Sequence, residues 1–276
     1  MSNDEFLMNV VNSYKQSTLF SGDEDQVFND LKYIVNSWFN VLCQKNSKAY
    51  CITMEIMRSG SREKGTAIKG KSDMDMFVSI SDTNGYFALR ELYDDLYDYL
   101  KKNGLKVRRQ NVSIGVVIKG YDIDVVPARK VNSISYVKQA IRYNDHYLWS
   151  NKTENRMLTN IQKHIELVRE SGIQNIIILL KIWKYQNQID FPSIYLEMMS
   201  IEAFKNYNNH GKTFENEALY AFNYIYKNII DKKVIDPSNS TNIISETLSL
   251  DEKKYIQKKA KEAIDAKYWS EVVHKR

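Results

Sequence analysis

The spacing of apolar residues over the first hundred positions predicts two helices and two strands. Apolar residues recur every three or four positions over 25–46 and again over 86–102, which is the period of a helix buried on one side. Gly104 stands where a glycine commonly ends a helix in the left-handed conformation. Extended apolar runs at 50–57 and 74–80 predict strands. Helices and strands therefore alternate in this part of the chain.

The apolar period changes to two beyond residue 104, as expected for strands with one buried side. Strands are predicted at 105–109, 112–118 and 121–126. The dipeptide Lys119-Gly120 between the last two fits a tight hairpin turn. These strands are expected to join the earlier ones in a mixed sheet.

From about residue 133 the pattern favours helices over strands. Four helices are predicted, at 159–170, 174–188, 192–204 and 250–272. Polar segments rich in Asn and Ser predict loops at 206–214 and 236–247. The chain is therefore expected to have an α/β fold in two lobes, a mixed-sheet lobe over residues 1–132 with a long N-terminal helix and a helical lobe over residues 133–276.

The composition is ordinary for a globular protein, with 43% hydrophobic and 26% charged residues among 276. A net charge of +5 carries little weight, and acidic residues interleave the basic run at 253–261, which favours a solvated helix face over a nucleic-acid patch. Cys43, Cys51 and the four histidines lack metal-ligand spacing, which argues against structural zinc and agrees with a reducing cytoplasmic compartment. We expect no secretory signal and no membrane span.

Two aspartates at the start of a predicted strand are the first candidates for chemistry. Asp73 and Asp75 are two residues apart, so on a strand their side chains point to one face, while Met74 and Met76 point to the other. Mg²⁺ prefers oxygen ligands and usually takes one or two carboxylates together with substrate phosphates. Taken alone, this spacing is more often a pair of solvated aspartates. The surrounding residues therefore decide whether Asp73 and Asp75 are metal ligands or solvated aspartates.

A glycine-serine turn precedes these aspartates. Gly60 and Ser61 follow the strand at 50–57 and come before a predicted helical turn. A glycine lets a phosphate approach the backbone, and N–H groups at the start of a helix bind anions. The Ser61 hydroxyl can donate a further hydrogen bond to a phosphate oxygen. By itself, Gly-Ser indicates only a turn.

A third carboxylate comes from the strand at 121–126. Asp124 lies on an apolar strand, where an unpaired carboxylate is costly to bury unless a cation is near. Asp122 points to the same face, so parity alone does not choose between the two. Three carboxylates beside a phosphate-binding turn predict a phosphoryl-transfer site with two divalent ions. One ion would assist deprotonation of an attacking 3′-hydroxyl, and the other would neutralise the triphosphate.

These residues resemble the signature of the polymerase-β-type nucleotidyltransferases, in which a Gly-Ser turn precedes an Asp-x-Asp strand. The chain is more similar to the oligoadenylate synthase and CD-NTase branch, the bacterial relatives of cyclic GMP–AMP synthase. The segments that carry this resemblance are 64–68, 72–75, 124–128, 180–183 and 191–197, with a weaker one at 236–242. The segment 108–114 and the form of 191–193 look most like the bacterial branch called CdnE.

The resemblance implies a polymerase-β-like nucleotidyltransferase lobe with a mixed sheet, and a helical C-terminal lobe that completes the nucleotide cleft. Asp73, Asp75 and Asp124 match the catalytic carboxylates of the family and its ligands for two Mg²⁺ (or Mn²⁺) ions. The position of Asp124 before Val-Val-Pro matches the family's third carboxylate better than Asp122 does. Gly60 and Ser61 match the turn that holds the triphosphate.

The resemblance also implies roles for residues of the helical lobe. Lys181 and Ser193 match residues that contact the triphosphate, although Lys181 is also compatible with a lysine that snorkels from a buried helix. Asn160 lies where related enzymes place a base-reading residue, and it is equally compatible with a helix cap. Glu197 is expected to hold the lobes together rather than to take part in chemistry.

The implied activity is synthesis of a cyclic di- or trinucleotide second messenger from ribonucleoside triphosphates (ATP, UTP or GTP). Members of the branch act in bacterial anti-phage defence (CBASS), where the cyclic product binds a separate downstream effector. For this chain we expect no membrane partner and no direct binding of nucleic acid. The alternatives are a nucleotidyltransferase with another acceptor, such as tRNA or a protein, and a catalytically silent nucleotide sensor. A tRNA-tailing enzyme needs a larger basic surface, and a silent sensor has no need to hold three like charges together.

Overall fold

The computed structural model describes residues 2–45, 52–82, 84–131, 145–208 and 213–276. Contacts divide the chain into two compact units. We call Thr18–Glu63 with Asp73–Ile165 the sheet unit, and Met1–Ser17 with Lys64–Ser72 and Glu166–Arg276 the helical unit. The boundary expected between residues 132 and 133 lies outside the described residues, as do Cys51 and His210. The two units are not separated at one point of the chain, because Met1–Ser17 and Lys64–Ser72 pack with the C-terminal helices.

The sheet unit contains a mixed sheet that has seven strands in the described chain, in the order β1-β2-β5-β4-β3, with β6 and β7 attached beside β5. β2 and β5 are parallel, and the other neighbouring pairs are antiparallel. The bounds of the strands are β1 (Thr53–Ser59), β2 (Met74–Ser81), β3 (Lys106–Arg109), β4 (Ile114–Ile118), β5 (Tyr121–Lys130), β6 (His146–Ser150) and β7 (Asn155–Thr159).

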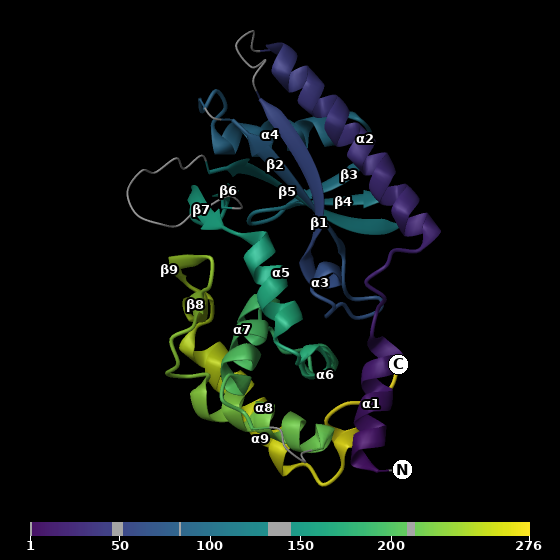
Figure 1. Ribbon diagram of the computed structural model, residues 1–276, viewed down its shortest axis with the longest axis vertical. Helices are drawn as coiled ribbons and strands as arrows, with labels where there is room; N and C mark the ends of the chain where they lie inside the picture. The colour runs from purple at the N-terminus through teal and green to yellow at the C-terminus, as the bar shows by residue number, and fades with distance from the viewer. Residues whose placement is uncertain (1, 46–51, 83, 132–144, 209–212) are drawn as a thin grey trace. The chain divides into compact units, whose positions relative to one another are not determined.

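One face of this sheet is covered by α2 (Gly22–Lys45) and α4 (Leu89–Lys102) (Figure 1). Met74, Met76 and Val78 from β2 lie buried with apolar residues of both helices, as the alternation predicted. The Trp38 indole of α2 donates to Asp95 Oδ2 of α4 at 2.9 Å, which ties the two helices together. The opposite face of β2 carries Asp75 at its start and then Phe77, which is buried with Ala128 and Leu148.

The expected strands and helices of the first 126 residues are confirmed where the structure describes them, but the stretch after residue 144 was partly misjudged. It was expected to be helical, and β6 and β7 instead extend the sheet. In β6, His146, Leu148 and Ser150 are buried, and Tyr147 and Trp149 only partly so. Such short half-polar strands gain their stability from pairing with β5 rather than from their own pattern.

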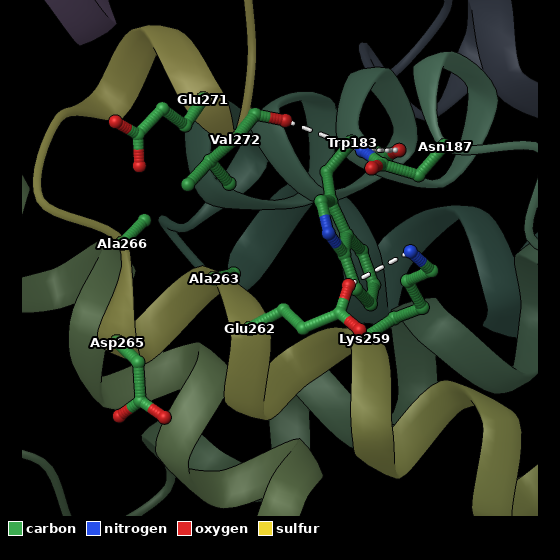
Figure 2. Close-up of a pocket in the computed structure, with 9 residues that line it drawn as sticks. All are labelled: Trp183, Asn187, Lys259, Glu262, Ala263, Asp265, Ala266, Glu271 and Val272. Carbon is green, nitrogen blue, oxygen red and sulfur yellow. Dashed lines mark hydrogen bonds and ion pairs between the residues drawn. The ribbon is translucent and has the colours of Figure 1, made fainter.

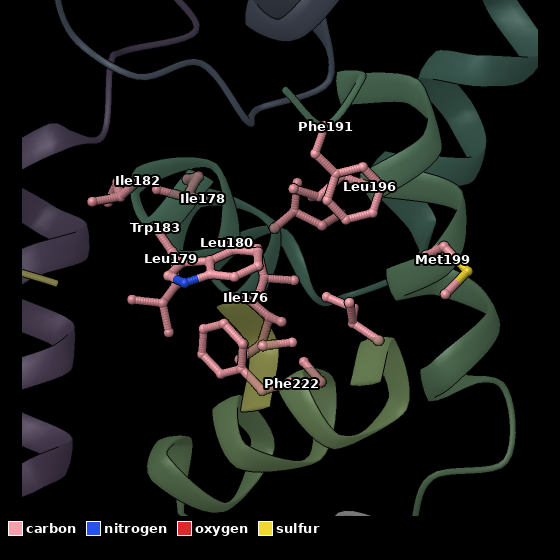
Figure 3. Close-up of a cluster of buried hydrophobic side chains, with 14 of the residues drawn as sticks. Ile176, Ile178, Leu179, Leu180, Ile182, Trp183, Phe191, Leu196, Met199 and Phe222 are labelled. Atoms are coloured by element: carbon pink, nitrogen blue, oxygen red, sulfur yellow. The ribbon is translucent and has the colours of Figure 1, made fainter. Parts of the chain in front are cut away.

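The helical unit surrounds the apolar helix α6 (Gln174–Gln186), whose residues 176–183 are all buried. Figure 3 shows side chains of α6 packed with Phe191, Leu196, Met199 and Phe222. The other helices are α1 (Asn3–Tyr14), α3 (Gly60–Glu63, in the sheet unit), α5 (Ile161–Glu170, which passes from one unit into the other), α7 (Ser193–Phe204), α8 (Phe214–Asn228) and α9 (Leu250–Asp265), with short 3₁₀ helices η2 (Ile244–Thr247) and η3 (Trp269–Glu271).

Two expectations for the helical unit are corrected. The loop predicted at 236–247 contains a small antiparallel pair, β8 (Ile235–Asp236) and β9 (Asn239–Ile243), and then η2. The helix predicted at 250–272 ends at Asp265, because the chain turns extended at Ala266 before η3. No helix among the described residues has both the length and the apolar character needed to cross a membrane.

Candidate functional site

One row of residues crosses five strands of the sheet unit and gathers the polar groups that the sequence singled out. Cross-strand neighbours in this row are Ser59 of β1, Asp75 of β2, Asp124 of β5, Gly115 of β4 and Arg108 of β3. Asp75 and Asp124 are direct partners on parallel strands, so the predicted convergence of these two positions is found at the level of the backbone.

The carboxylates lie on the face of the sheet that α2 and α4 leave uncovered. Alternation places Asp75 opposite the buried Met74 and Met76, and Asp124 opposite the buried Ile123. Asp73 directly precedes β2, and Asp122 lies on the same face of β5 as Asp124. Side-chain exposure falls from 45% for Asp73 and Asp122 to 22% for Asp124, so Asp124 is the most enclosed of the three.

Gly60 is required at the turn between β1 and α3. Its φ of +73° lies in the left-handed region that side chains rarely adopt, and a Cβ built there would lie only 1.7 Å from Asp75 Oδ2. A glycine is therefore needed for the backbone to approach this carboxylate closely. Ser61 follows in the same turn, and the neighbouring Arg62 is buried in an ion pair with Glu24 of α2. This pair fixes the turn against the helix layer.

Arg108 occupies the space between the carboxylates. Its Nη1 donates to Asp122 Oδ1 at 2.8 Å, and its Nη2 lies 3.9 Å from Asp73 Oδ2 and 3.7 Å from Asp124 Oδ1. The segment 108–114 entered the prediction only as part of the family resemblance, and no role was expected of Arg108. Arg108 could not be placed beside the carboxylates from the sequence, because its pairing with Gly115 of β4 is a matter of strand register.

The ionisation of the carboxylates reflects their crowding. Burial raises the pKa of Asp73, the charge of Asp122 raises it further, and Arg108 opposes both. Burial also raises the pKa of Asp124, with the charge of Asp73 acting in the same direction and Arg108 against it. The hydrogen bond to Asp122 raises the pKa of Arg108. The cluster therefore has a shortage of positive charge, which one guanidinium only partly relieves.

These residues fit divalent cations in their chemistry. The ligand atoms are carboxylate oxygens, which Mg²⁺ and Mn²⁺ prefer. Asp124 Oδ1 is buried and accepts no hydrogen bond from the described residues, and Arg108 Nη2 lies 3.7 Å from it. Among the described residues, no three Asp, Glu, His or Cys side chains are close enough together to hold one metal ion. Arg108 lies near Asp73 and Asp124, so one cation already faces two of the candidate ligands.

Lys181, predicted to contact the triphosphate, lies in a buried network of the helical unit. Its Nζ lies 2.7 Å from Glu197 Oε1, 2.9 Å from Thr66 Oγ1 and 3.3 Å from the Thr66 carbonyl oxygen. An ammonium has three N–H donors, and three acceptors surround this one. Lys64 pairs with the other oxygen of Glu197 at 2.8 Å. Glu197 thus holds segments of one unit together, which is a structural task as expected.

Lys184, one turn further along α6, lies beside the predicted Ser193. Its Nζ donates to the Phe191 carbonyl oxygen at 2.5 Å and to Ser193 Oγ at 3.3 Å. Burial lowers the pKa of Lys184, and the charge of Lys181 lowers it further. The charges of Asp190 and Glu197 act in the opposite direction, and the two hydrogen-bond acceptors of Lys184 are neutral. No role was expected of Lys184 from the sequence, and only the packing of α6 against the start of α7 distinguishes it from Lys181.

Asn160 caps α5. Its Oδ1 accepts from the Lys163 N–H at 2.9 Å, and its Nδ2 donates to Asp145 Oδ1 at 2.9 Å. Of the two interpretations left open, the structure shows the cap. A base-reading role for Asn160 stays a prediction.

A separate cavity of about 370 Å³ lies in the helical unit (Figure 2). It is lined by the Trp183 indole, by Asn187 and by charged residues of α9 and η3, and Lys259 and Glu262 form an ion pair at 2.7 Å in its wall. None of the predicted site residues lines it. We therefore assign it no part in the candidate site.

Comparison with known proteins supports the predicted resemblance. No family model matches the chain. The chain is 24% identical over 198 residues to a protein of Escherichia coli strain MS 115-1 named cyclic AMP-AMP-AMP synthase. The match covers 66% of this chain and spans 59% of the length of that curated relative.

Solved CD-NTase structures share the fold. CdnC of E. coli MS115-1 with ATP superposes with a TM-score of 0.69 at 20% identity, over 96% of this chain and 91% of that one. CdnG of Bradyrhizobium diazoefficiens with GTP gives 0.70 at 12% identity, over 96% and 89%. The CdnE cyclic dinucleotide synthase of Elizabethkingia meningoseptica with GTP and Apcpp gives 0.66 at 15% identity, over 96% and 100%.

These matches confirm the predicted α/β class, with a polymerase-β-like nucleotidyltransferase sheet and a helical C-terminal part. They include CdnC, CdnG and CdnE, so closeness to the CdnE branch in particular stays a prediction.

Proposed function

We propose that this CD-NTase-like chain is a nucleotidyltransferase that makes a cyclic di- or trinucleotide from ribonucleoside triphosphates. The observation that supports it most is the pairing of Asp75 with Asp124 on neighbouring parallel strands, with Gly60 closing on Asp75. Asp73 Oδ2 and Asp124 Oδ1 lie 3.9 and 3.7 Å from the same Arg108 nitrogen, which supports assigning Asp73 to the same site. The name of the curated relative, and the nucleotides bound in the similar CdnC and CdnE structures, point to the same class of reaction.

The residues would divide the work according to their position. Asp73, Asp75 and Asp124 would hold Mg²⁺ or Mn²⁺, two ions in our proposal, through their carboxylate oxygens. Such ions, when bound, help to deprotonate a hydroxyl nucleophile and neutralise the charge of a triphosphate. Gly60 would let the phosphates approach the backbone, and Ser61 would donate a hydrogen bond to a phosphate oxygen.

The helical unit is proposed to supply contacts to the triphosphate through Lys184 and Ser193. The resemblance assigned this contact to Lys181, but Glu197 and Thr66 already surround that ammonium. Lys184 donates to a carbonyl oxygen and a hydroxyl oxygen, and a phosphate oxygen would be a stronger acceptor than either. We keep Lys181 as a residue that anchors the segment 64–72.

The biological role proposed is that of a CBASS synthase in the cytoplasm, whose cyclic product acts on a separate effector. The resemblance and the relatives support this role. Which bases are joined, and how many, is a matter for the product assay.

The product assay uses the purified chain with all four labelled ribonucleoside triphosphates and Mg²⁺ or Mn²⁺. Phosphatase treatment should leave a cyclic product that mass spectrometry identifies. The double variant Asp73→Ala with Asp75→Ala should make none and keep its circular dichroism spectrum, whereas Asp98→Ala, a change of an exposed carboxylate on α4, should leave synthesis unchanged. Product from the double variant would reject the site. Labelling of added tRNA or of a protein instead would reject cyclisation.

A further inference from the structure

The arginine between the carboxylates reaches them across a position that has no side chain. Arg108 lies on β3, and β4 separates that strand from β5. The β4 residue opposite both Arg108 and Asp124 is Gly115. A Cβ built on Gly115 would lie 2.6 Å from Arg108 Nε and 2.7 Å from its Cγ and Cζ. Any other residue at this position would therefore block the path of the guanidinium.

Gly115 has no conformational reason to be glycine, because its φ lies outside the left-handed region. The structural consequence of glycine here is the slot that Arg108 fills. The adjacent Arg109 behaves differently, since alternation sends it to the helix-covered face. There it pairs with Asp94 of α4, and its guanidinium lies 4.1 Å from the centroid of the Tyr97 ring. Two neighbouring arginines thus serve opposite faces of one strand.

We propose that Arg108, seated on Gly115, is a built-in cation that holds the catalytic carboxylates in the metal-free protein and must leave them when a divalent ion binds. Arg108 would thereby weaken the affinity of the empty enzyme for metal, so that the ion binds well only together with the nucleotide. This inference rests on the proposed function, because it takes Asp73 and Asp124 as metal ligands.

The charges support exclusion of one cation by the other. One nitrogen of Arg108 lies within 3.9 Å of both Asp73 and Asp124, so an ion bound to those oxygens would stand within a few ångströms of a positive guanidinium. Like charges at such a separation repel even in a water-like medium. Arg108 is half exposed, so it can swing outwards without unfolding the strand. Its hydrogen bond to Asp122 is the contact that would hold it in place.

The test is a titration of the nucleotide-free protein with Mn²⁺, with the free ion followed by electron paramagnetic resonance. Arg108→Gln removes the cation, and Gly115→Ala displaces it without changing any charge. Each change should tighten Mn²⁺ binding about tenfold. The two changes together should tighten it no more than Arg108→Gln alone, because both act through one guanidinium. Arg109→Gln, which removes the same charge from the other face of β3, should leave Mn²⁺ affinity unchanged.

Each result has one meaning. Equal or weaker Mn²⁺ binding by Arg108→Gln would overturn the inference, and so would an additive gain in the double variant. An equal gain in Arg109→Gln would show a general effect of net charge and would also overturn it. The product assay separates this inference from the proposed function. If the wild type makes a cyclic product but Arg108→Gln and Gly115→Ala bind Mn²⁺ as the wild type does, only the role of Arg108 is rejected. If the two variants bind Mn²⁺ more tightly but the wild type makes no nucleotide product, only the proposed synthase activity is rejected.

Discussion

Replacing Glu197 by glutamine is expected to destabilise the helical unit strongly while preserving the shape of the side chain. Glu197 is buried on α7, and its two oxygens each accept from a lysine, Lys64 at 2.8 Å and Lys181 at 2.7 Å. Glutamine keeps one acceptor oxygen but removes the negative charge. Two ammonium groups would then face a neutral amide in a buried place, which is a costly arrangement.

The size of the effect follows from the ionisation of this carboxyl. Burial alone would raise the pKa of Glu197, but the charges of Lys64 and Lys181 and their hydrogen bonds lower it from 4.5 to about 2. At 1.36 kcal/mol for each pKa unit, the difference corresponds to about 3 kcal/mol of stability at neutral pH. Breaking a buried ion pair by removing one partner costs about 3–5 kcal/mol. The two routes agree on about 3 kcal/mol.

The pH dependence gives a second, independent signature. Because the folded pKa of about 2 lies below the ordinary 4.5, the Glu197 contribution is complete above the ordinary pKa and is lost as the pH falls towards 2. The wild type should therefore lose about 3 kcal/mol from this group over that range, and the glutamine variant should not. The stability gap between the two proteins should close as the pH falls.

Urea unfolding followed by far-ultraviolet circular dichroism measures the gap, and hydrogen exchange should assign the loss to the amides of α6 and α7. Glu202→Gln is a matched control on the same helix. Glu202 pairs with Lys205 and Lys232 but is 31% exposed, so its loss should cost less than about 1 kcal/mol. A Glu197→Gln variant within 1 kcal/mol of the wild type, or a gap that does not change with pH, would refute the reasoning.

Two further predictions concern the candidate site. Gly60→Ala should destabilise the sheet unit by about 1–3 kcal/mol and abolish synthesis, because alanine is strained at a positive φ and its Cβ would collide with Asp75; urea unfolding and the product assay measure the two effects, and an active, stable variant would contradict them. Lys184→Met should raise KM for the nucleotide at least about tenfold with little change in stability, because a charge-assisted phosphate contact is lost; unchanged kinetics would return the triphosphate contact to the prediction for Lys181, and Lys227→Met on α8 is the control.

The candidate chemistry could be found in the sequence because it depends on local spacing. The period of two around Asp73 and Asp75 places both on one face of a strand, and the same rule places Asp122 and Asp124 together. The buried partners Met74 and Met76 follow from the same alternation. The α/β class and most of the early helices and strands were predictable for a similar reason, since the apolar period changes visibly between 3.6 and 2.

Long-range pairing could not be found in this way. Nothing local to Arg108 indicates that Gly115 is its cross-strand neighbour, or that Asp124 lies one strand further on. The choice between Lys181 and Lys184 has the same origin, because one turn of α6 points both lysines in similar directions. Only the positions of Thr66 and Glu197 decide which of the two is buried in an ion pair.

The sequence by itself thus determined the alternation of faces and the turn at Gly60, because neighbouring residues constrain one another through backbone geometry alone. The choice of Asp124 over Asp122 as the third candidate carboxylate came from the family resemblance. The tertiary structure decided the strand register that unites Asp75 with Asp124, the pairing of β6 and β7 with the sheet, and the buried network around Glu197. Each of these joins segments distant in the chain, and their stability comes from contacts that exist only once the segments have packed together.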